Sequence, residues 1–175
     1  MSASRYRKFA IACLVSSLLL APVAEAITVI LKNKAKPRLS IRVGEKNSKI
    51  SEVAFAVPAT RIGDGTPVTG APSIFIELRI QASGASPLTG ELTADSLSNP
   101  LSNADGSTIP FSEISWTSRD DDIPSGRFNG TTNQSLVSFP SSGRISDYHT
   151  FSYANTAEVE AGIYSGRIIY TWAIP

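Results

Sequence analysis

Short apolar runs that alternate with polar residues constrain this chain more than any other feature of its sequence. Alternation with a period of two is the pattern of a half-buried β-strand, and no stretch shows the 3.6-residue periodicity of an amphipathic helix. The runs are "SEVAFAVPA", "PSIFIELRI", "FSEISWTS", "QSLVSF", "HTFSYAN" and "AGIYSGRIIYTWAIP". Gly, Pro, Ser, Asn and Asp, which favour turns, separate them. We therefore predict one all-β domain, a sandwich or a barrel.

The stretches between these runs are predicted to be loops. Residues 61–72 and 98–110 are rich in turn residues, and Asp105-Gly106 predicts a tight turn in the second of them. Residues 117–134 form the longest loop-like stretch, polar and rich in Gly, Ser and Asn. Within residues 87–97 we expect a single turn of helix.

Two of the strand predictions carry most of the apolar surface. In "PSIFIELRI" one face holds Ile74, Ile76, Leu78 and Ile80. In the final run one face holds Tyr164, Ile168, Tyr170, Trp172 and Ile174. Aromatic and β-branched side chains suit a half-buried pleated surface, so we predict a terminal strand here that ends the chain at Pro175.

The first 26 residues have the composition of a secretory signal peptide. Arg5, Arg7 and Lys8 are basic, residues 9–20 are apolar but too short to span a bilayer, and Ala24-Glu25-Ala26 offers a cleavage site. Acylation of Cys13, as in a lipoprotein, is the weaker alternative, because few apolar residues precede this cysteine. We therefore expect an exported protein and exclude residues 1–26 from the fold.

The part of the chain behind this leader is nearly neutral and free of cysteine. Of the 16 basic and 15 acidic residues, three and one lie in the leader, and so does the single cysteine. This charge balance gives no support to nucleic-acid binding or to a polybasic membrane patch. An exported domain without disulfides must be held together by burial and backbone pairing, or by something outside itself.

Residues that could support catalysis or metal binding are few. His149 is the only histidine, it lies at a predicted strand start, and no G-x-S-x-G pattern accompanies it, so we read it as a surface or strand residue. Asp120, Asp121 and Asp122 are adjacent but lack the EF-hand spacing, which favours a solvated turn over a calcium site. We predict no catalytic residue, no metal site and no cofactor.

Other motifs in the long loop have ordinary explanations. "NGT" (129–131) and "NQS" (133–135) match glycosylation acceptors, and we attribute the match to coincidence in a chain with a leader of bacterial appearance. Phe128 is an aromatic residue that a receptor could contact, but anchoring of the loop is the better explanation.

The stretch behind the leader, "ITVILKNKAKPRLSIRVG" (27–44), reads as two strands. Ile27, Val29 and Leu31 alternate with other residues, Pro37 marks a break, and a second alternating run starts at Arg38. A strand at this position can pair within its own sandwich, which composition alone favours. It can also complete the sheet of another molecule, as in donor-strand complementation.

Three segments resemble one family. "ITVILKNKAKPRLSIRV", "LTADSLSNPLSNADGSTIPFSEISW" and "EAGIYSGRIIYTWAIP" are similar, in order and spacing, to segments of chaperone–usher pilins of the alpha class. Those proteins are fimbrial major subunits of the colonisation-factor-antigen type. The family has a few polar residues before its I-T-V motif, whereas the predicted cleavage places Ile27 first.

This resemblance implies an incomplete immunoglobulin-like sandwich over residues 38–175, completed by a donor strand from a neighbouring subunit. Residues 27–37 would be the donor extension, with Ile27, Val29 and Leu31 filling the neighbour's groove. The acceptor groove would be lined by the terminal-strand residues Tyr164, Ile168, Tyr170, Trp172 and Ile174. The implied partners are identical or related pilin subunits, a periplasmic chaperone and an outer-membrane usher, and the implied location is a cell-surface fimbrium reached through the periplasm.

Three alternatives remain open from the sequence. The chain can be a minor or tip adhesin whose loops near residues 120–130 bind a surface receptor. It can be a self-contained β-sandwich in the periplasm or outside the cell. A secreted hydrolase that uses His149 has the least support.

Overall fold

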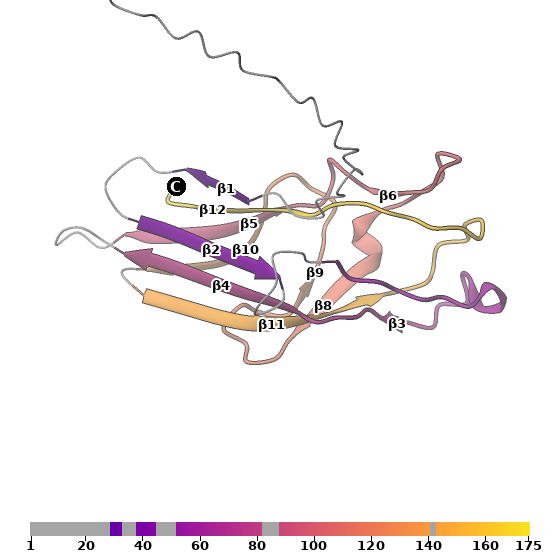
Figure 1. Ribbon diagram of the computed structural model, residues 1–175, viewed down its shortest axis with the longest axis horizontal. Helices are drawn as coiled ribbons and strands as arrows, with labels where there is room; N and C mark the ends of the chain where they lie inside the picture. Colours follow the sequence, from indigo (N-terminus) through magenta and orange to yellow (C-terminus); the bar gives the residue numbers. More distant parts are fainter. Residues whose placement is uncertain (1–28, 33–37, 45–51, 82–87, 141–142) are drawn as a thin grey trace, which may run out of the picture.

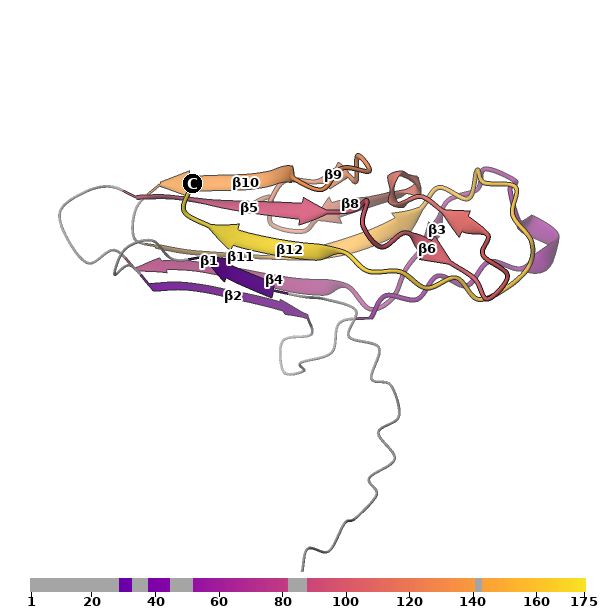
Figure 2. The ribbon, with the colours of Figure 1, turned by 90° about the horizontal axis from the view of Figure 1, so that it is seen from above.

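The computed structural model of the chain describes residues 29–32, 38–44, 52–81, 88–140 and 143–175. These residues form strands arranged in two facing layers, with only two short 3-10 turns, η1 (Ala59–Arg61) and η2 (Phe111–Glu113) (Figures 1 and 2). The predicted all-β sandwich is therefore confirmed.

Each layer is one sheet. The first has the order β1 (Val29–Lys32), β12 (Ile169–Ala173), β5 (Thr89–Asp95) and β10 (Gln134–Pro140). The second has the order β2 (Arg38–Gly44), β4 (Ile74–Gln81), β11 (Gly143–Tyr153), β8 (Ile114–Ser118) and β9 (Gly126–Arg127), and β3 (Val68–Thr69) also pairs with β11. A separate hairpin joins β6 (Leu101–Ser102) to β7 (Thr108–Ile109). Among these described ladders, only the pairing of β1 with β12 is parallel.

The core lies between the two sheets. As predicted for β4, the four isoleucine and leucine side chains of its inner face are buried, and so are Ile114 and Trp116 of β8. Trp172 of β12 is fully buried, its ring stacks on Phe139 at 5.2 Å, and its indole N–H donates to the Arg79 carbonyl oxygen of the opposite sheet at 3.1 Å. This tryptophan therefore ties the two layers together.

The helical turn expected within residues 87–97 is wrong, because Thr89–Asp95 of this segment form strand β5. Its burial alternates, with Gly90, Leu92 and Ala94 facing the core. A Cβ atom at Gly90 would lie 2.1 Å from the Trp172 ring, so glycine is needed where the tryptophan crosses the strand. Pairing with β10 and β12 on both sides outweighs the weak local preference for a turn.

Two of the predicted strands are shorter than their apolar patterns. Residues 52–58 alternate between exposed and half-buried, but a single bridge, between Ala54 and Ala71, pairs them. In the terminal run, the ladder covers only Ile169–Ala173, and the preceding residues have one bridge, between Ser165 and Ser102. Alternation thus predicted the face that each residue presents, but not the length of the ladder.

The first described strand pairs within its own chain, which is the alternative that composition alone favoured. Residues Val29–Lys32 lie in parallel beside Tyr170–Ala173 of β12 (Figure 1). The expected leader, Ile27 and Pro37 lie outside the described residues. In the described part of the chain, no helix is long and apolar enough to cross a membrane.

Candidate functional site

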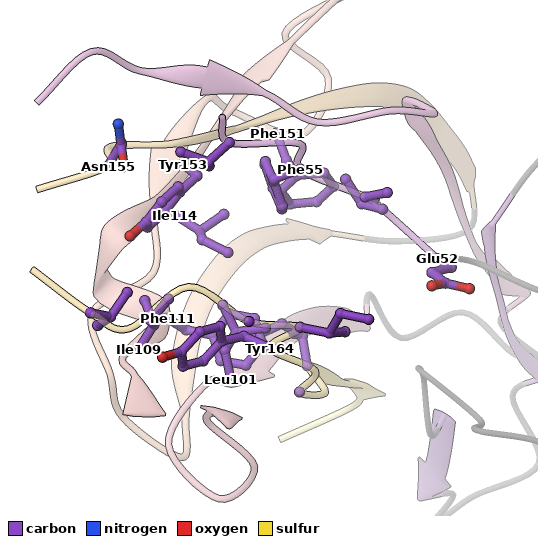
Figure 3. A pocket seen from close by; sticks show the side chains of 18 of the residues that line it. Glu52, Phe55, Leu101, Ile109, Phe111, Ile114, Phe151, Tyr153, Asn155 and Tyr164 are labelled. Atoms are coloured by element: carbon purple, nitrogen blue, oxygen red, sulfur yellow. The ribbon is translucent and has the colours of Figure 1, made fainter. Parts of the chain in front are cut away.

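An apolar groove of about 460 Å³ opens between the two sheets. One wall includes Phe55 with Phe151 and Tyr153, and the facing wall includes Leu101 and Tyr164, as Figure 3 shows. The volume falls in the range of about 300–1,000 Å³ that is usual for ligand sites. Its apolar lining indicates an apolar occupant, of either peptide or small-molecule nature.

The first wall comes from the extended segment 52–58. Two backbone hydrogen bonds, of 2.8 and 3.0 Å, join Ala54 to Ala71 and hold this segment in place. The alternation then turns Val53, Phe55 and Val57 toward the groove. A Cβ atom at Gly70 would lie 2.5 Å from Val53, so the close approach of this wall depends on a glycine.

The second wall comes from residues 163–170. Backbone hydrogen bonds of 2.9 and 3.0 Å join Ser102 and Ser165, and Tyr164 and Ile168 beside them face the groove. A Cβ atom at Gly166 would lie 2.7 Å from the Pro100 carbonyl oxygen, so this wall also depends on a glycine. The Tyr164 hydroxyl donates to the Glu160 carbonyl oxygen at 3.1 Å, which fixes the ring.

The structure divides the residues predicted for an acceptor groove. Tyr164, Ile168 and Tyr170 line the groove, whereas Trp172 lies in the closed core and Ile174 packs against that core. Of the predicted donor residues, Val29 is opposite Tyr170 and Leu31 is opposite Trp172 in the β1–β12 ladder. Ile27 lies outside the described residues; among the residues that the structure describes, the N-terminal strand meets the groove lining at Tyr170.

The groove has acidic groups at its boundary and neutral phenols in the buried part of its lining. Glu52 and Glu160 belong to its lining, both are exposed, and Glu52 marks one end in Figure 3. Burial raises the pKa of Tyr170 and of Tyr153, so both phenols stay neutral at ordinary pH. Among the described residues, no group of three or more His, Cys, Asp or Glu side chains is placed to hold a metal ion.

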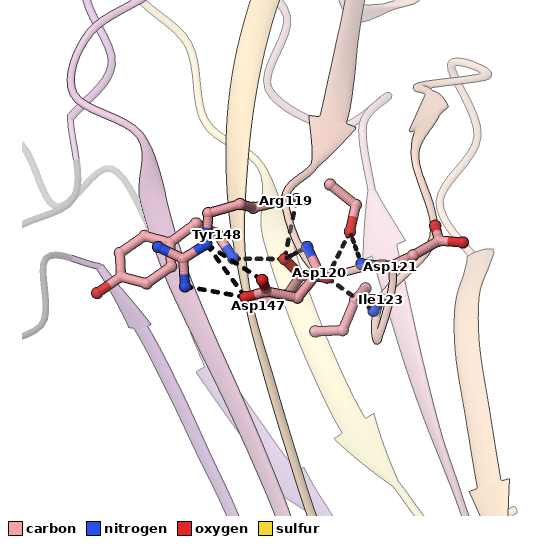
Figure 4. A network of polar contacts seen from close by, with 7 residues as sticks. Arg119, Asp120, Asp121, Ile123, Asp147 and Tyr148 are labelled. Atoms are coloured by element: carbon pink, nitrogen blue, oxygen red, sulfur yellow. Dashed lines mark hydrogen bonds and ion pairs between the residues drawn. The ribbon is translucent and has the colours of Figure 1, made fainter.

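A second polar arrangement surrounds the carboxylate of Asp147 (Figure 4). The backbone N–H groups of Arg119, Asp120 and Ile123 donate to it at 3.1 Å each, the Tyr148 N–H donates at 2.7 Å, and the Ser118 hydroxyl also donates. Burial raises the pKa of Asp147, but the hydrogen bonds from the hydroxyl and the backbone outweigh it and lower the pKa to about 2. The carboxylate therefore stabilises the loop, and its oxygens are engaged in these hydrogen bonds.

The loop that wraps Asp147 contains the three adjacent aspartates. The side chains of Asp120, Asp121 and Asp122 are exposed, as expected for a solvated turn. Asp121 has a φ of 63°, which bends the chain so that its neighbours' N–H groups point at Asp147. The sequence pattern pointed to these three carboxylates, but the groups that contact Asp147 are backbone N–H groups of the loop.

His149 lies inside strand β11 and is buried, so the expectation of a strand residue is confirmed, whereas a surface position and a strand start at this residue are wrong. Its ring stacks on Trp116 at 5.8 Å and its Nε2–H donates to the Ile123 carbonyl oxygen at 3.1 Å. Burial lowers the pKa of His149, so the imidazole is neutral at ordinary pH. Phe128 is 2% exposed and its ring packs against Trp116, so it anchors its loop, as predicted.

Comparison of the chain with protein-family models, with curated proteins and with solved structures finds no match. Sequence reasoning missed the wall formed by Val53, Phe55 and Val57, although their alternation was visible. Gly166 lets two backbones approach each other closely at this site, and Gly70 leaves room for the side chains of Val53 and Phe55.

Proposed function

We propose that this chain is a structural subunit of a bacterial surface pilus or fimbria, and that its N-terminal strand links one subunit to the next. The observation that carries the proposal is the apolar groove, which lies between two extended segments that each have only one bridge. Such a groove accepts an extended apolar strand along its length. Assembled subunits would support adhesion or biofilm formation.

The two edges of the groove offer backbone groups as well as apolar walls. Segment 52–58 bounds one sheet and segment 163–168 leads into β12 of the other. A strand of about ten residues laid along this groove would bury three or more apolar side chains, each contributing about 1.5–3 kcal/mol. Each backbone hydrogen bond that it formed would add about 1 kcal/mol net.

The N-terminal segment of a second copy has the composition that this groove requires. It alternates Ile27, Val29 and Leu31 and then carries Lys32, Lys34 and Lys36. The groove is apolar inside and has Glu52 and Glu160 on its lining. Opposite charges at such a boundary favour one orientation and one register more than they add affinity.

Exchange of this strand would produce a fibre. Each subunit donates one strand and accepts one, so the contact is heterologous and does not close on itself. A subunit with an empty groove exposes apolar surface, which is why we propose a periplasmic chaperone as its first partner and an outer-membrane usher as the second. The expected leader is consistent with that route.

The test is to delete residues 27–36 and to add them back as a peptide. We expect the intact protein to polymerise, and the truncated protein to remain monomeric and to bind the peptide with a gain in thermal stability. A peptide with Val29→Ser and Leu31→Ser is the matched control and should not bind. A truncated chain that folds, ignores the peptide and keeps its stability would contradict the proposal.

A self-contained sandwich is the second candidate, because the structure pairs β1 with β12 of the same chain. In that case the intact protein is a stable monomer at every concentration. Deletion of residues 27–36 would then destabilise it without creating a site for a peptide from another molecule.

A further inference from the structure

We infer that strand β1 is a cis latch: residues Val29–Lys32 cover the edge of β12 in the monomer and compete there with the same strand of a second copy. This inference rests on the proposed function and concerns its regulation. It follows from the ladder in which the four residues of β1 face Tyr170, Thr171, Trp172 and Ala173 in turn.

The cis ladder is short and parallel. It has four residue pairs and it is parallel, whereas β12 and β5 share five pairs and are antiparallel. Parallel pairing is slightly less stable per residue than antiparallel pairing. A strand that arrives from another molecule can adopt the antiparallel direction, so it has a better ladder available to it.

Chain connectivity limits how far β1 can slide along β12 toward the groove. Only residues 33–37 separate β1 from β2, and these two strands belong to opposite sheets. The ladder covers β12 from Tyr170 onward, while Tyr164 and Ile168 line the groove beyond it. Figure 3 shows Tyr164 on the groove wall. The strand of a second copy is not tied to this molecule's β2, so it can occupy both the edge and the groove.

The competition depends on concentration. A segment attached by a short connection has an effective concentration of the order of millimolar at its own site. At low protein concentration the cis strand therefore wins despite its short ladder, and the subunit stays monomeric. When subunits are crowded, or when β1 is displaced, the longer intermolecular pairing wins and assembly begins.

A pair of engineered cysteines distinguishes the two states. Ile30 and Thr171 are directly opposed, and neighbouring strands lie about 4.7–4.9 Å apart, which suits a disulfide. The full chain would carry Ile30→Cys and Thr171→Cys together with Cys13→Ser, which removes the only natural cysteine. A second matched pair is Lys32→Cys with Ala173→Cys, and Ile30→Cys with Ile169→Cys is the control displaced by two residues.

At low concentration, we expect the matched pairs to oxidise within one chain, at least about tenfold faster than the displaced pair, because only they are opposed at high effective concentration. The locked protein should form fibres at least about tenfold more slowly than the same protein after reduction. The inference is overturned if neither matched pair oxidises within a chain, or if the locked protein assembles as fast as the reduced one.

The outcomes also separate this inference from the proposed function. If the wild-type protein polymerises but no disulfide forms within a chain, the latch is wrong and strand exchange stands. If the disulfide forms and the wild-type protein neither polymerises nor binds the peptide of residues 27–36, strand exchange is wrong. The chain is then a self-contained sandwich.

Discussion

The terminal run of alternating apolar residues contributes side chains to both ends of the sandwich, yet one end is closed and the other is open. At the closed end, Trp172 lies between β5 and β4, stacks on Phe139 and is fully buried. At the open end, Tyr164 and Ile168 belong to the same run but face a groove of about 460 Å³. An apolar pattern therefore does not by itself determine where a core is complete.

The difference between the closed and the open end arises from β5, the strand beside β12. β5 pairs with β12 up to Asp95, and there the chain turns, because the Asp95 carboxylate accepts hydrogen bonds from the N–H groups of Leu97 and Ser98 at 3.0 and 2.9 Å. Residues 163–168 consequently lack a continuous ladder partner on that side and have one bridge to Ser102. A single Asx turn thus sets the boundary between the closed and the open end.

The largest expected effect comes from removing the Asp147 carboxylate, which holds the loop that follows β8 in the second sheet. Asp147→Ala should lower the free energy of unfolding by about 4 kcal/mol, because several N–H donors around this fully buried carboxylate each lose a partner worth about 1–3 kcal/mol. Urea unfolding measures this change in the free energy of unfolding. Asp122→Asn, at an exposed aspartate of the same loop, is the control and should change stability by less than about 0.5 kcal/mol.

A glycine at each end tests the packing directly. Gly90→Ala places a Cβ atom 2.1 Å from the Trp172 ring and should cost about 3 kcal/mol, the upper range for overpacking. Gly162→Ala at the open end meets its nearest atom at 3.8 Å and should cost less than about 0.5 kcal/mol. Equal losses in thermal unfolding would show that the two ends are packed alike.

Acid should destabilise the fold through Asp147. The pKa of Asp147 is lowered to about 2, below its value in an unfolded chain, so its contribution is complete above about pH 4 and is lost as the pH falls toward 2. The loss amounts to about 2 kcal/mol, at about 1.4 kcal/mol per pH unit of the shift. The difference in unfolding free energy between wild type and Asp147→Ala should shrink over this range; a constant difference would contradict the assignment.

The smallest effect on stability is expected at the open end. Val57→Ser on the groove wall should cost about 1 kcal/mol, because Val57 is only half-buried, yet it should reduce assembly or peptide binding about tenfold. Leu97→Ser, at a leucine that is 57% exposed, serves as the control and should leave assembly unchanged. Loss of assembly in both variants would indicate a general effect of surface polarity.

Much of the fold was predictable because alternation reports the face that a residue presents. The inner face of β4 and the loop anchor Phe128 followed from pattern alone. In β10, the adjacent apolar residues Leu136 and Val137 obscured the alternation because the register shifts there. The strand β5 was missed because its regularity depends on two partners distant in sequence.

The site was less predictable, for a physical reason. The groove wall at Phe55 and the one at Tyr164 lie over one hundred positions apart, and nothing in either run states that they face each other. The donors to Asp147 are backbone groups of residues 119–123, which carry no signature of their own in the sequence. Side-chain patterns can predict apolar surfaces but not which backbone groups they bring together.

The parallel pairing of β1 with β12 has a mechanical consequence. The first described strand enters the ladder at Val29 beside Tyr170, and the last described strand leaves it at Ala173 beside Lys32. Tension applied toward the two ends of the chain would therefore slide these strands past each other and strain all their hydrogen bonds at once. A subunit held in this way is loaded in shear, so its hydrogen bonds must break together and not one after another.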